Sequence, residues 1–279
     1  MAELDAAHLR SWIGREERVS DLVTARGVRE MRATLDLPPG TPQPGDEAPL
    51  AAQWCLAPPT VPNSGLGPDG HPARGGFLPP VPLPRRMWAG GALAFHDALR
   101  VGDAVERHST IEDVVVKEGR TGTLCFVTLK HLYATPRGLA VEERQDVVYR
   151  GADAASGGSG AADGPRAARH SETVVPTPML LFRYSAITFN GHRIHYDRDY
   201  CLHEEGYPGL IVHGPLQATL LAGFAARLLG RRPARFTFRS VRPIFDGAPM
   251  TLNAAEASEG LELWTADADG RAAMLAQAV

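Results

Sequence analysis

Histidines are concentrated in one short stretch of the chain. Four of the ten lie between residues 192 and 213, at His192, His195, His203 and His213. Segment 182–189 is rich in Phe, Tyr, Ile and Thr and leads into a polar AsnGlyHis turn, so we interpret it as a strand that ends in a loop. Loops at the ends of rigid elements often carry catalytic groups, and imidazole is the usual acid or base near neutral pH.

The spacing of His192 and His195 also allows a metal-site interpretation. The HisArgIleHis segment has i, i+3 spacing, but no carboxylate lies between the rings. The preceding β-like run argues against a helix that would direct both rings at one ion. We therefore predict no metal ligand here. Ordinary hydrogen-bonded histidines are the plain alternative, and composition alone favours it.

A second feature is the HisGly pair at 213–214, directly before an apolar run from Pro215 to Leu229. A helix N-terminus offers unpaired N–H groups and a partial positive charge, and glycine lets a ligand oxygen approach the backbone closely. Gly214 is therefore a candidate donor to a developing oxyanion. The alternative is a Gly-Pro turn that only starts a buried helix.

Six arginines and no acidic residue lie between residues 227 and 242. In a chain of formal net charge −3 this is a local positive patch. It could hold phosphates such as those of coenzyme A, and we assign that role to Arg232, Arg235 and Arg239. Some of these arginines would otherwise complement the C-terminus of the preceding helix.

Composition excludes several classes of protein. The chain has 279 residues, of which 44% are hydrophobic and 22% charged, so it is globular and not disordered. Its net charge of −3 disfavours a nucleic-acid partner. Three scattered cysteines favour a reducing, cytoplasmic setting. The charged N-terminus is not a signal peptide, and prolines interrupt the uncharged stretch 206–226, so we predict no membrane span.

The first half of the chain reads as a helix, a loop and a meander of strands. Residues 5–36 have a helical pattern with Ser20 as an N-cap candidate. Residues 37–86 contain 14 of the 23 prolines, but also Trp54 and Phe77, which indicates an ordered, packed loop. Strands are expected at 104–116, 123–133 and 139–149.

The second half repeats this meander after a linker. Residues 151–170 have no large apolar side chain. The apolar helix from Pro215 to Leu229 should end at Gly230. Strands are expected at 235–242, 250–257 and 261–279, the last a hairpin. Two such halves with one long apolar helix suggest sheets wrapped around a helix.

At this point the sequence resembles the MaoC-like, hot-dog-fold hydratases and dehydratases of acyl thioesters. Segment 190–195, AsnGlyHisArgIleHis, lies on that family's Asp-x-Asn-Pro-x-His motif, and His213-Gly214 lies on its second motif. Three segments, 76–91, 143–150 and 189–197, point to a narrower group within this family. They are similar to itaconyl-CoA and mesaconyl-C4-CoA hydratases and to mitochondrial-type 3-hydroxyacyl-thioester dehydratases.

The resemblance implies an α+β double hot-dog fold with two antiparallel sheets, the C-terminal one wrapped around the central helix. Residues 1–150 would form a degenerate half, 151–170 a linker and 171–279 the catalytic half. His195 matches the family's catalytic histidine, and Asn190 stands where most members have a catalytic aspartate. No cofactor is implied beyond the coenzyme A of an acyl-CoA substrate. A homodimer is compatible with the sequence.

Hydration of an enoyl thioester needs a polarised carbonyl, a base for water and an acid for the α-carbon. We expect Gly214 to polarise the carbonyl and His195, with an ordinary pKa near 6.5, to take and return the proton. Asn190 can hold water but cannot titrate, so one dominant ionisation is expected. The candidate substrate-binding residues, cations for a second carboxylate among them, are Arg86, Arg183, Arg193 and His213.

Three other functions remain open on the sequence alone. A fatty-acid-type 3-hydroxyacyl-ACP or -CoA dehydratase would share the site and differ in its acyl tunnel. A hot-dog thioesterase would direct water at the carbonyl, usually with a carboxylate where Asn190 stands. A non-catalytic acyl-CoA-binding protein would bind the thioester and leave it unchanged.

Overall fold

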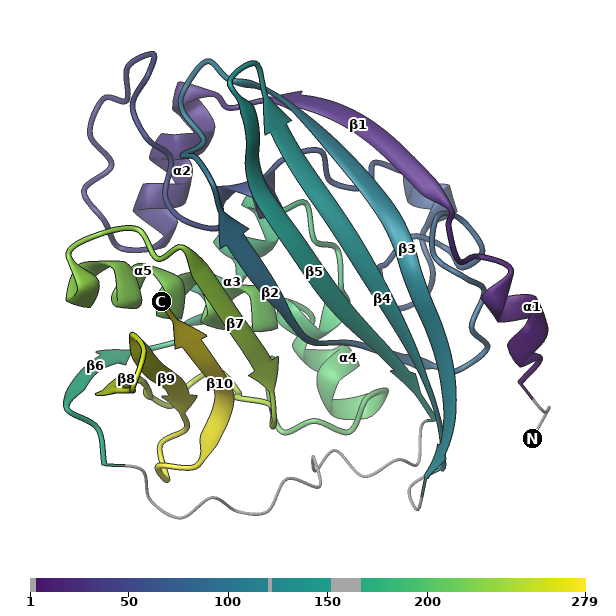
Figure 1. Ribbon diagram of the computed structural model, residues 1–279. Coiled ribbons are helices and arrows are strands. Elements are labelled where there is room, and N and C mark those ends of the chain that lie inside the picture. The colour runs from purple at the N-terminus through teal and green to yellow at the C-terminus, as the bar shows by residue number, and fades with distance from the viewer. Residues whose placement is uncertain (1–3, 120–121, 152–166) are drawn as a thin grey trace.

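The computed structural model describes residues 4–119, 122–151 and 167–279 (Figure 1). Its strands form one antiparallel ten-stranded sheet in the order β1-β3-β4-β5-β2-β7-β10-β9-β8-β6. The strands are β1 (Glu16–Leu22), β2 (Arg85–Phe95), β3 (Ala104–Gly119), β4 (Gly122–Thr135), β5 (Gly138–Arg150), β6 (His170–Val174), β7 (Arg235–Ser240), β8 (Met250–Glu256), β9 (Leu261–Ala266) and β10 (Ala272–Ala278).

The α-helices are α1 (Ala6–Arg10), α2 (Ala25–Thr34), α3 (Pro178–Ile187), α4 (Arg198–His203) and α5 (Gly214–Leu229). In Figure 1, α3 and α4 lie behind the strands, α5 lies to the left of β7, and α1 lies to the right of β3. Short 3-10 turns η1, η2 and η3 occur at Ala52–Cys55, Asn63–Gly65 and Arg193–His195. Among the residues so described, no helix is long and apolar enough to cross a membrane.

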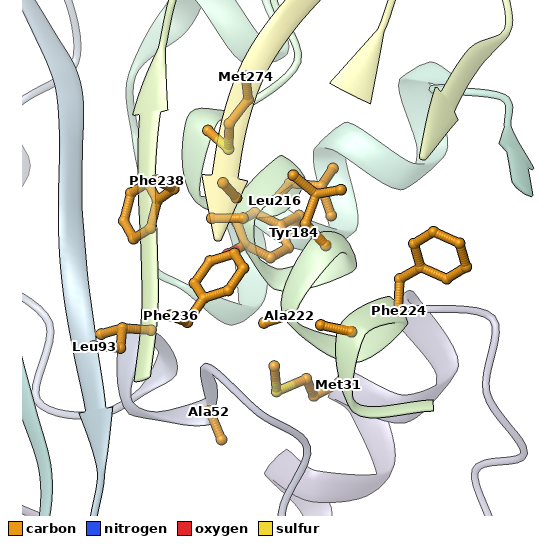
Figure 2. Close-up of a cluster of buried hydrophobic side chains, with 14 of the residues drawn as sticks. Met31, Ala52, Leu93, Tyr184, Leu216, Ala222, Phe224, Phe236, Phe238 and Met274 are labelled. Carbon is orange, nitrogen blue, oxygen red and sulfur yellow. The ribbon is translucent and has the colours of Figure 1, made fainter. Parts of the chain in front are cut away.

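Helix α5 is the apolar centre of the second half, as predicted. It starts at Gly214 and ends at Gly230, whose φ of 65° provides the left-handed C-cap. Leu216 and Leu221 are fully buried, and Phe224 is 2% exposed (Figure 2). Each such burial contributes about 1.5–3 kcal/mol. The strand predictions for this half agree with β7, β8, β9 and β10.

The two halves meet where β2 pairs with β7, which joins the two expected sheets into one. Gly90 and Gly91 lie at this junction. A Cβ atom on Gly90 would collide with the Phe238 carbonyl oxygen, and one on Gly91 with that of Arg144. Only glycine allows the backbones to approach this closely, so the AlaGlyGly run at 89–91 is a structural requirement of the junction.

The proline-rich segment 37–84 is ordered and packed, as predicted. Val81 is fully buried in a cluster with Ile111, Val127 and Tyr149 of strands β3–β5, and Phe77 packs against the same cluster. The predicted three-strand meander is present as β3, β4 and β5. This segment therefore covers the sheet of the first half.

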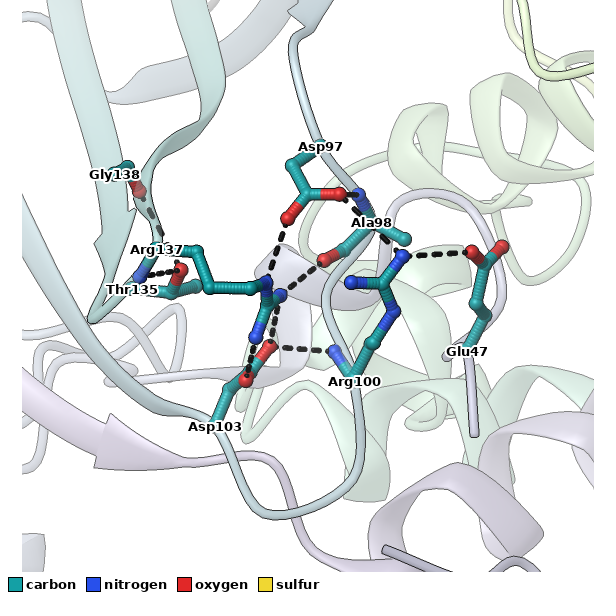
Figure 3. Close-up of polar contacts among 8 residues, drawn as sticks. All are labelled: Glu47, Asp97, Ala98, Arg100, Asp103, Thr135, Arg137 and Gly138. Carbon is teal, nitrogen blue, oxygen red and sulfur yellow. Dashed lines mark hydrogen bonds and ion pairs between the residues drawn. The ribbon is translucent and has the colours of Figure 1, made fainter. Parts of the chain in front are cut away.

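An ionic network holds two turns of the first half together (Figure 3). Arg137, in the β4–β5 turn, donates to both carboxylate oxygens of Asp103 and to Asp97. Its Nη2 also donates to the Ala98 carbonyl oxygen at 2.9 Å. Asp103 in turn accepts from the Arg100 backbone N–H at 2.7 Å. The β4–β5 turn is thus fixed to the β2–β3 connection.

The prediction of one helix over residues 5–36 is wrong. Residues 16–22 form β1, an edge strand paired with β3, and Ser20 lies within it. The cap of α2 is Thr24, whose Oγ1 accepts the Gly27 N–H at 2.9 Å. Exposure alternates along β1, as expected for a strand. An edge strand buries little, so most residues of β1 are polar and the sequence shows no clear alternation of apolar and polar residues.

The prediction of a strand over 182–189 is also wrong, because these residues belong to α3 and its C-terminal turn. Thr177 caps α3 by accepting the Leu180 N–H at 3.2 Å, and Pro178 occupies its first turn. The buried side chains Leu181, Tyr184 and Ser185 have helical i, i+3, i+4 spacing. Aromatic composition was misleading here, whereas the Thr-Pro start was the usable signal.

The predicted boundaries at 1–150, 151–170 and 171–279 stay predictions. Residues 152–166 of the predicted linker lie outside the described residues. Its last residue, His170, is the first residue of β6.

Candidate active site

His195 lies in the η3 turn that follows α3, directly beside the start of α5. Its Nδ1–H donates to the Ile211 carbonyl oxygen at 2.7 Å, which fixes the ring and leaves the Nε2 lone pair free. Burial lowers the pKa of this imidazole to about 4, below the ordinary value used in the sequence analysis. His195 is therefore neutral and an acceptor at physiological pH.

The ring of His213 packs against the ring of His195. Its ring stacks on that of His195 with centroids 3.6 Å apart and planes 18° apart. Its Nε2 shares a 2.8 Å hydrogen bond with the Ser185 hydroxyl. The side chain is completely buried, so it contacts protein and not the cavity. The assignment of His213 to substrate binding stays a prediction, and in the structure its ring packs on His195 and is not part of the cavity wall.

Gly214 is the first residue of α5, so its N–H has no partner within the helix. A Cβ atom here would lie 3.4 Å from Cε3 of Trp88, so the backbone is close to that ring. The next residue, Pro215, lines the cavity described below. Gly214 thus presents the positive end of a 16-residue helix beside the cavity wall.

Asn190 closes the turn that carries the histidine motif. Its Oδ1 accepts the His192 backbone N–H at 3.0 Å, which is an Asx turn. Its side chain lines the cavity. The Nδ2 amino group makes no hydrogen bond to the part of the chain that the structure describes, so it is available as a donor to a ligand or water.

A cavity of about 930 Å³ lies between the proline-rich segment, the inner face of β2–β5 and α3. Its wall includes Trp54, His71, Arg86, Trp88, Asn190 and Pro215. The volume is that of a small-molecule site. A second hollow of about 460 Å³, lined by 242–249 and 267–271, contains none of the predicted site residues.

Of the predicted arginines, Arg86 alone lines this cavity. It forms no ion pair with a carboxylate of the described chain. Burial is the main cause of the lowered pKa of His71 and His192, and the nearby charge of Arg86 lowers both further. Arg193, by contrast, is occupied: its guanidinium donates to Asp197 Oδ2 at 2.8 and 2.9 Å. Arg183 is exposed on α3, away from the cavity wall.

The predicted phosphate-binding arginines are not brought to the cavity. Arg235 and Arg239 alternate along β7 with the buried Phe236 and Phe238, so they project from the other face of the sheet. Arg232 lies in the turn before β7. Their assignment to coenzyme A stays a prediction, because none of the three lines the cavity.

The sequence analysis missed the loop Gly65–Ala73, which reaches the histidine motif from the first half. His71 packs on His192 with ring centroids 4.0 Å apart, and His192 lies 5.4 Å from His195 by the same measure. Asp69 Oδ2 accepts the His71 Nδ1–H at 3.0 Å. An Asp-Gly-His triplet in a proline-rich loop is a signal for a turn that presents a histidine.

Within the described ranges, one set of three side chains is close enough to hold a metal ion. Ligand atoms of Asp69, His71 and His192 lie within 4.8 Å of one another. His195, the other histidine of the i, i+3 spacing, is not part of this set. Because Asp69 and His71 already satisfy each other by a hydrogen bond, the arrangement is complete without an ion.

Comparisons with known proteins identify the family of this chain. Residues 51–246 match the family model of hydroxyacyl-thioester dehydratase type 2. Over 274 residues, 98% of each chain, the sequence is 43% identical to mesaconyl-C(4)-CoA hydratase of Chloroflexus aurantiacus. The matched region contains both the Asp69–His71 loop and the 190–214 motif.

Solved structures share the fold. HtdX of Mycobacterium tuberculosis is similar with a TM-score of 0.68 at 20% identity, covering 95% of this chain and 99% of that one. Another M. tuberculosis protein, described as a double hotdog fold, gives a TM-score of 0.55 at 12% identity and covers 95% of each chain. The predicted α+β double hot-dog fold is confirmed. The chain belongs to the hydroxyacyl-thioester dehydratase type 2 family of MaoC-like hydratases and dehydratases.

Proposed function

We propose that this enzyme adds water reversibly to the double bond of a short, branched or dicarboxylic enoyl-CoA, such as mesaconyl-C4-CoA or itaconyl-CoA, with citramalyl-CoA as product. The observation that carries the proposal is the neutral His195, whose Nδ1–H is fixed on Ile211 and whose Nε2 is left as a base. The 43% identity to a mesaconyl-C(4)-CoA hydratase supports the choice of acyl group.

The reaction divides between three groups. The Gly214 N–H, at the positive end of α5, polarises the thioester carbonyl as enolate character develops. His195 Nε2 takes a proton from water as the oxygen attacks the β-carbon, and the imidazolium then returns that proton to the α-carbon. Asn190 Nδ2 donates to the water and holds its oxygen toward the substrate.

Arg86 is the cation that suits a dicarboxylic substrate. In mesaconyl-C4-CoA the free carboxylate is attached to the β-carbon, so its partner must lie beside the group that activates water. Arg86 lines the cavity, and its charge lowers the pKa of the neighbouring His71 and His192, secondary to burial. A guanidinium there can bind the carboxylate through two parallel hydrogen bonds.

The test is the loss of enoyl-thioester absorbance when the protein is mixed with mesaconyl-C4-CoA or crotonyl-CoA. For itaconyl-CoA, whose double bond is not conjugated with the thioester, the test is the formation of citramalyl-CoA, followed by mass spectrometry. We expect turnover of a dicarboxylic thioester by wild type and at least about 10²-fold less by His195→Ala. His203→Ala, at an exposed histidine on α4, is the matched control. Turnover of crotonyl-CoA alone would favour the fatty-acid-type dehydratase that the family description also covers.

Two further results would replace the proposal. Release of free thiol with no hydrated product would identify a thioesterase. Tight binding of the thioester without change would identify an acyl-CoA-binding protein. A cytoplasmic setting and a homodimer remain predictions, which fractionation and light scattering would test.

A further inference from the structure

The loop Gly65–Ala73 is a built element and not a loose connection. The Ala73 N–H donates to Gly65 O at 2.8 Å, and the Gly67 N–H donates to His71 O at 2.7 Å, which closes the loop as a tight hairpin. Gly70 has a φ of +86°, and a Cβ atom on it would collide with the Gly191 carbonyl oxygen. The loop tip is therefore shaped to sit on the histidine motif.

Further hydrogen bonds clamp this loop to the motif. The Arg193 N–H donates to the Asp69 carbonyl oxygen at 2.9 Å, and Arg193 Nη1 donates to Pro68 O at 3.0 Å. The Arg193 side chain is in turn held by Asp197. Arg193, predicted from sequence to bind substrate, thus fixes a loop of the first half against the catalytic turn of the second.

The clamp brings a carboxylate–imidazole pair to the cavity. Asp69 Oδ1 accepts the His71 backbone N–H at 3.0 Å, while Oδ2 accepts the His71 Nδ1–H at 3.0 Å. The tautomer is thereby set, and Nε2 is the free nitrogen of a ring that lines the cavity with 20% of its side chain exposed. His195 has the same tautomer, fixed by Ile211 O in place of the carboxylate, but its ring is not part of the cavity wall.

We propose that His71 is a second catalytic residue of the reaction and Asp69 its positioning residue, supplied by the first half of the chain where Asn190 leaves the motif without a carboxylate. The proposal rests on the hydratase function above. One water molecule donates its two hydrogens to the Nε2 atoms of His71 and His195. Its oxygen lone pair is then directed at the β-carbon of the substrate.

The proton balance closes without another reactant. The water oxygen forms a bond to the β-carbon, one O–H bond breaks, and its proton goes to an Nε2 atom of the pair. The electrons of the double bond move to the thioester oxygen as an enolate, beside Gly214. The α-carbon then takes the proton back, and both histidines are neutral again. Between these two proton transfers the histidine cluster carries one positive charge, which the Asp69 carboxylate offsets.

The charged surroundings of His71 favour a catalytic site over a merely structural contact. Burial opposes ionisation of Asp69, yet the hydrogen bonds from His71 hold its pKa well below the usual range, so it is a carboxylate. Burial lowers the pKa of His71, and Arg86 and Arg74 act in the same direction. His192 packs on this ring from the motif, and no other carboxylate of the described residues is hydrogen-bonded to a histidine of the cluster.

The experiment compares steady-state hydration by His71→Ala, Asp69→Asn and His203→Ala with wild type and His195→Ala. We expect kcat to fall on the order of 10²-fold in His71→Ala and about 10-fold in Asp69→Asn, with KM changed less than about threefold. Added imidazole should restore part of the His71→Ala rate, because the vacated place opens to the cavity. It should not alter the rate of Asp69→Asn or His203→Ala.

The outcomes separate this proposal from the function on which it rests. Wild-type kcat in His71→Ala, alongside an inactive His195→Ala, would overturn the role of His71 and leave the hydratase intact. A lower rate that imidazole does not restore, with an unchanged Asp69→Asn, would reduce His71 to a structural contact. Loss of wild-type activity on chelation, regained with Zn²⁺, would replace the pair by a metal site. Wild type inactive on every enoyl-CoA would overturn both proposals.

Discussion

At the scale of single residues, the proposed mechanism uses two histidines, His71 and His195, whose pKa values are lowered mainly by burial. A neutral His195 with Nδ1 engaged can accept a proton only at Nε2, so its burial also determines which nitrogen acts. The motif predicts His195 as the base, and that role stays a prediction. The low proton affinity of His195 was not predictable, because burial comes from His213 and from segments distant in the sequence.

The pH dependence of hydration follows from the lowered pKa of His195. The base works when it is unprotonated, which holds above its folded pKa of about 4. We expect kcat/KM to stay level from roughly pH 8 to 5.5 and to fall below about pH 5 as the ring protonates. A fall centred near pH 6.5, measured by initial rates in buffers of constant ionic strength, would show that the base is not buried as described.

Arg86 gives a prediction about specificity. Arg86→Leu should raise KM for mesaconyl-C4-CoA by about 10- to 100-fold, since a charged hydrogen-bonded pair is lost, and leave KM for crotonyl-CoA within about twofold. Arg183→Leu is the control, at an exposed arginine outside the cavity. Equal effects of Arg86→Leu on both substrates would mean that Arg86 does not bind the second carboxylate.

At the scale of elements, the β4–β5 turn is held by a carboxylate. The Arg137 guanidinium beside Asp103 keeps the pKa of that carboxyl below its usual range. Because the folded pKa is depressed, this contribution to stability is present above the unfolded pKa and is lost as the pH falls through the folded pKa. Asp103→Asn should therefore lower the free energy of unfolding at pH 7 by about 1–3 kcal/mol. The free energy of unfolding of the variant should also fall less steeply than that of wild type as the pH is lowered.

Urea unfolding at pH 7 and at pH 3 checks this prediction. Glu259→Gln, at an exposed acid outside any ion pair of the described chain, serves as the control and should unfold like wild type. If Asp103→Asn keeps the wild-type difference in stability between the two pH values, the network does not carry the acid dependence.

The junction of β2 and β7 predicts a second effect on stability. Gly90→Ala places a methyl group against the backbone of β7, so it should destabilise the fold by about 1–3 kcal/mol. Gly76→Ala is the matched control, since a Cβ atom there meets nothing within 4 Å. Thermal unfolding followed by circular dichroism compares the two. Equal melting temperatures would show that the junction has room for a side chain.

At the scale of the whole molecule, local patterns and long-range contacts differed in how well they could be predicted. Helix α5 was predictable because its sixteen mostly apolar residues, followed by Gly230 as a C-cap, are a local signal for a buried helix. The edge strand β1 was not, because its pairing with β3 decides it. Helix α3 was missed because of its aromatic composition, although the Thr177-Pro178 start is a local signal for a helix. The Asp69–His71 loop was missed because its meaning lies in contact with Gly191 and Arg193, far along the chain.

The most direct test of the account follows the oxygen of the attacking water. Wild-type protein is incubated with mesaconyl-C4-CoA in ¹⁸O-labelled water, and the products are analysed by mass spectrometry. The account predicts an intact thioester that carries one ¹⁸O as a hydroxyl on the β-carbon, and incorporation at least about 10²-fold slower with His195→Ala. Label found in a released carboxylate together with free coenzyme A would contradict it, because the water would then have attacked the carbonyl.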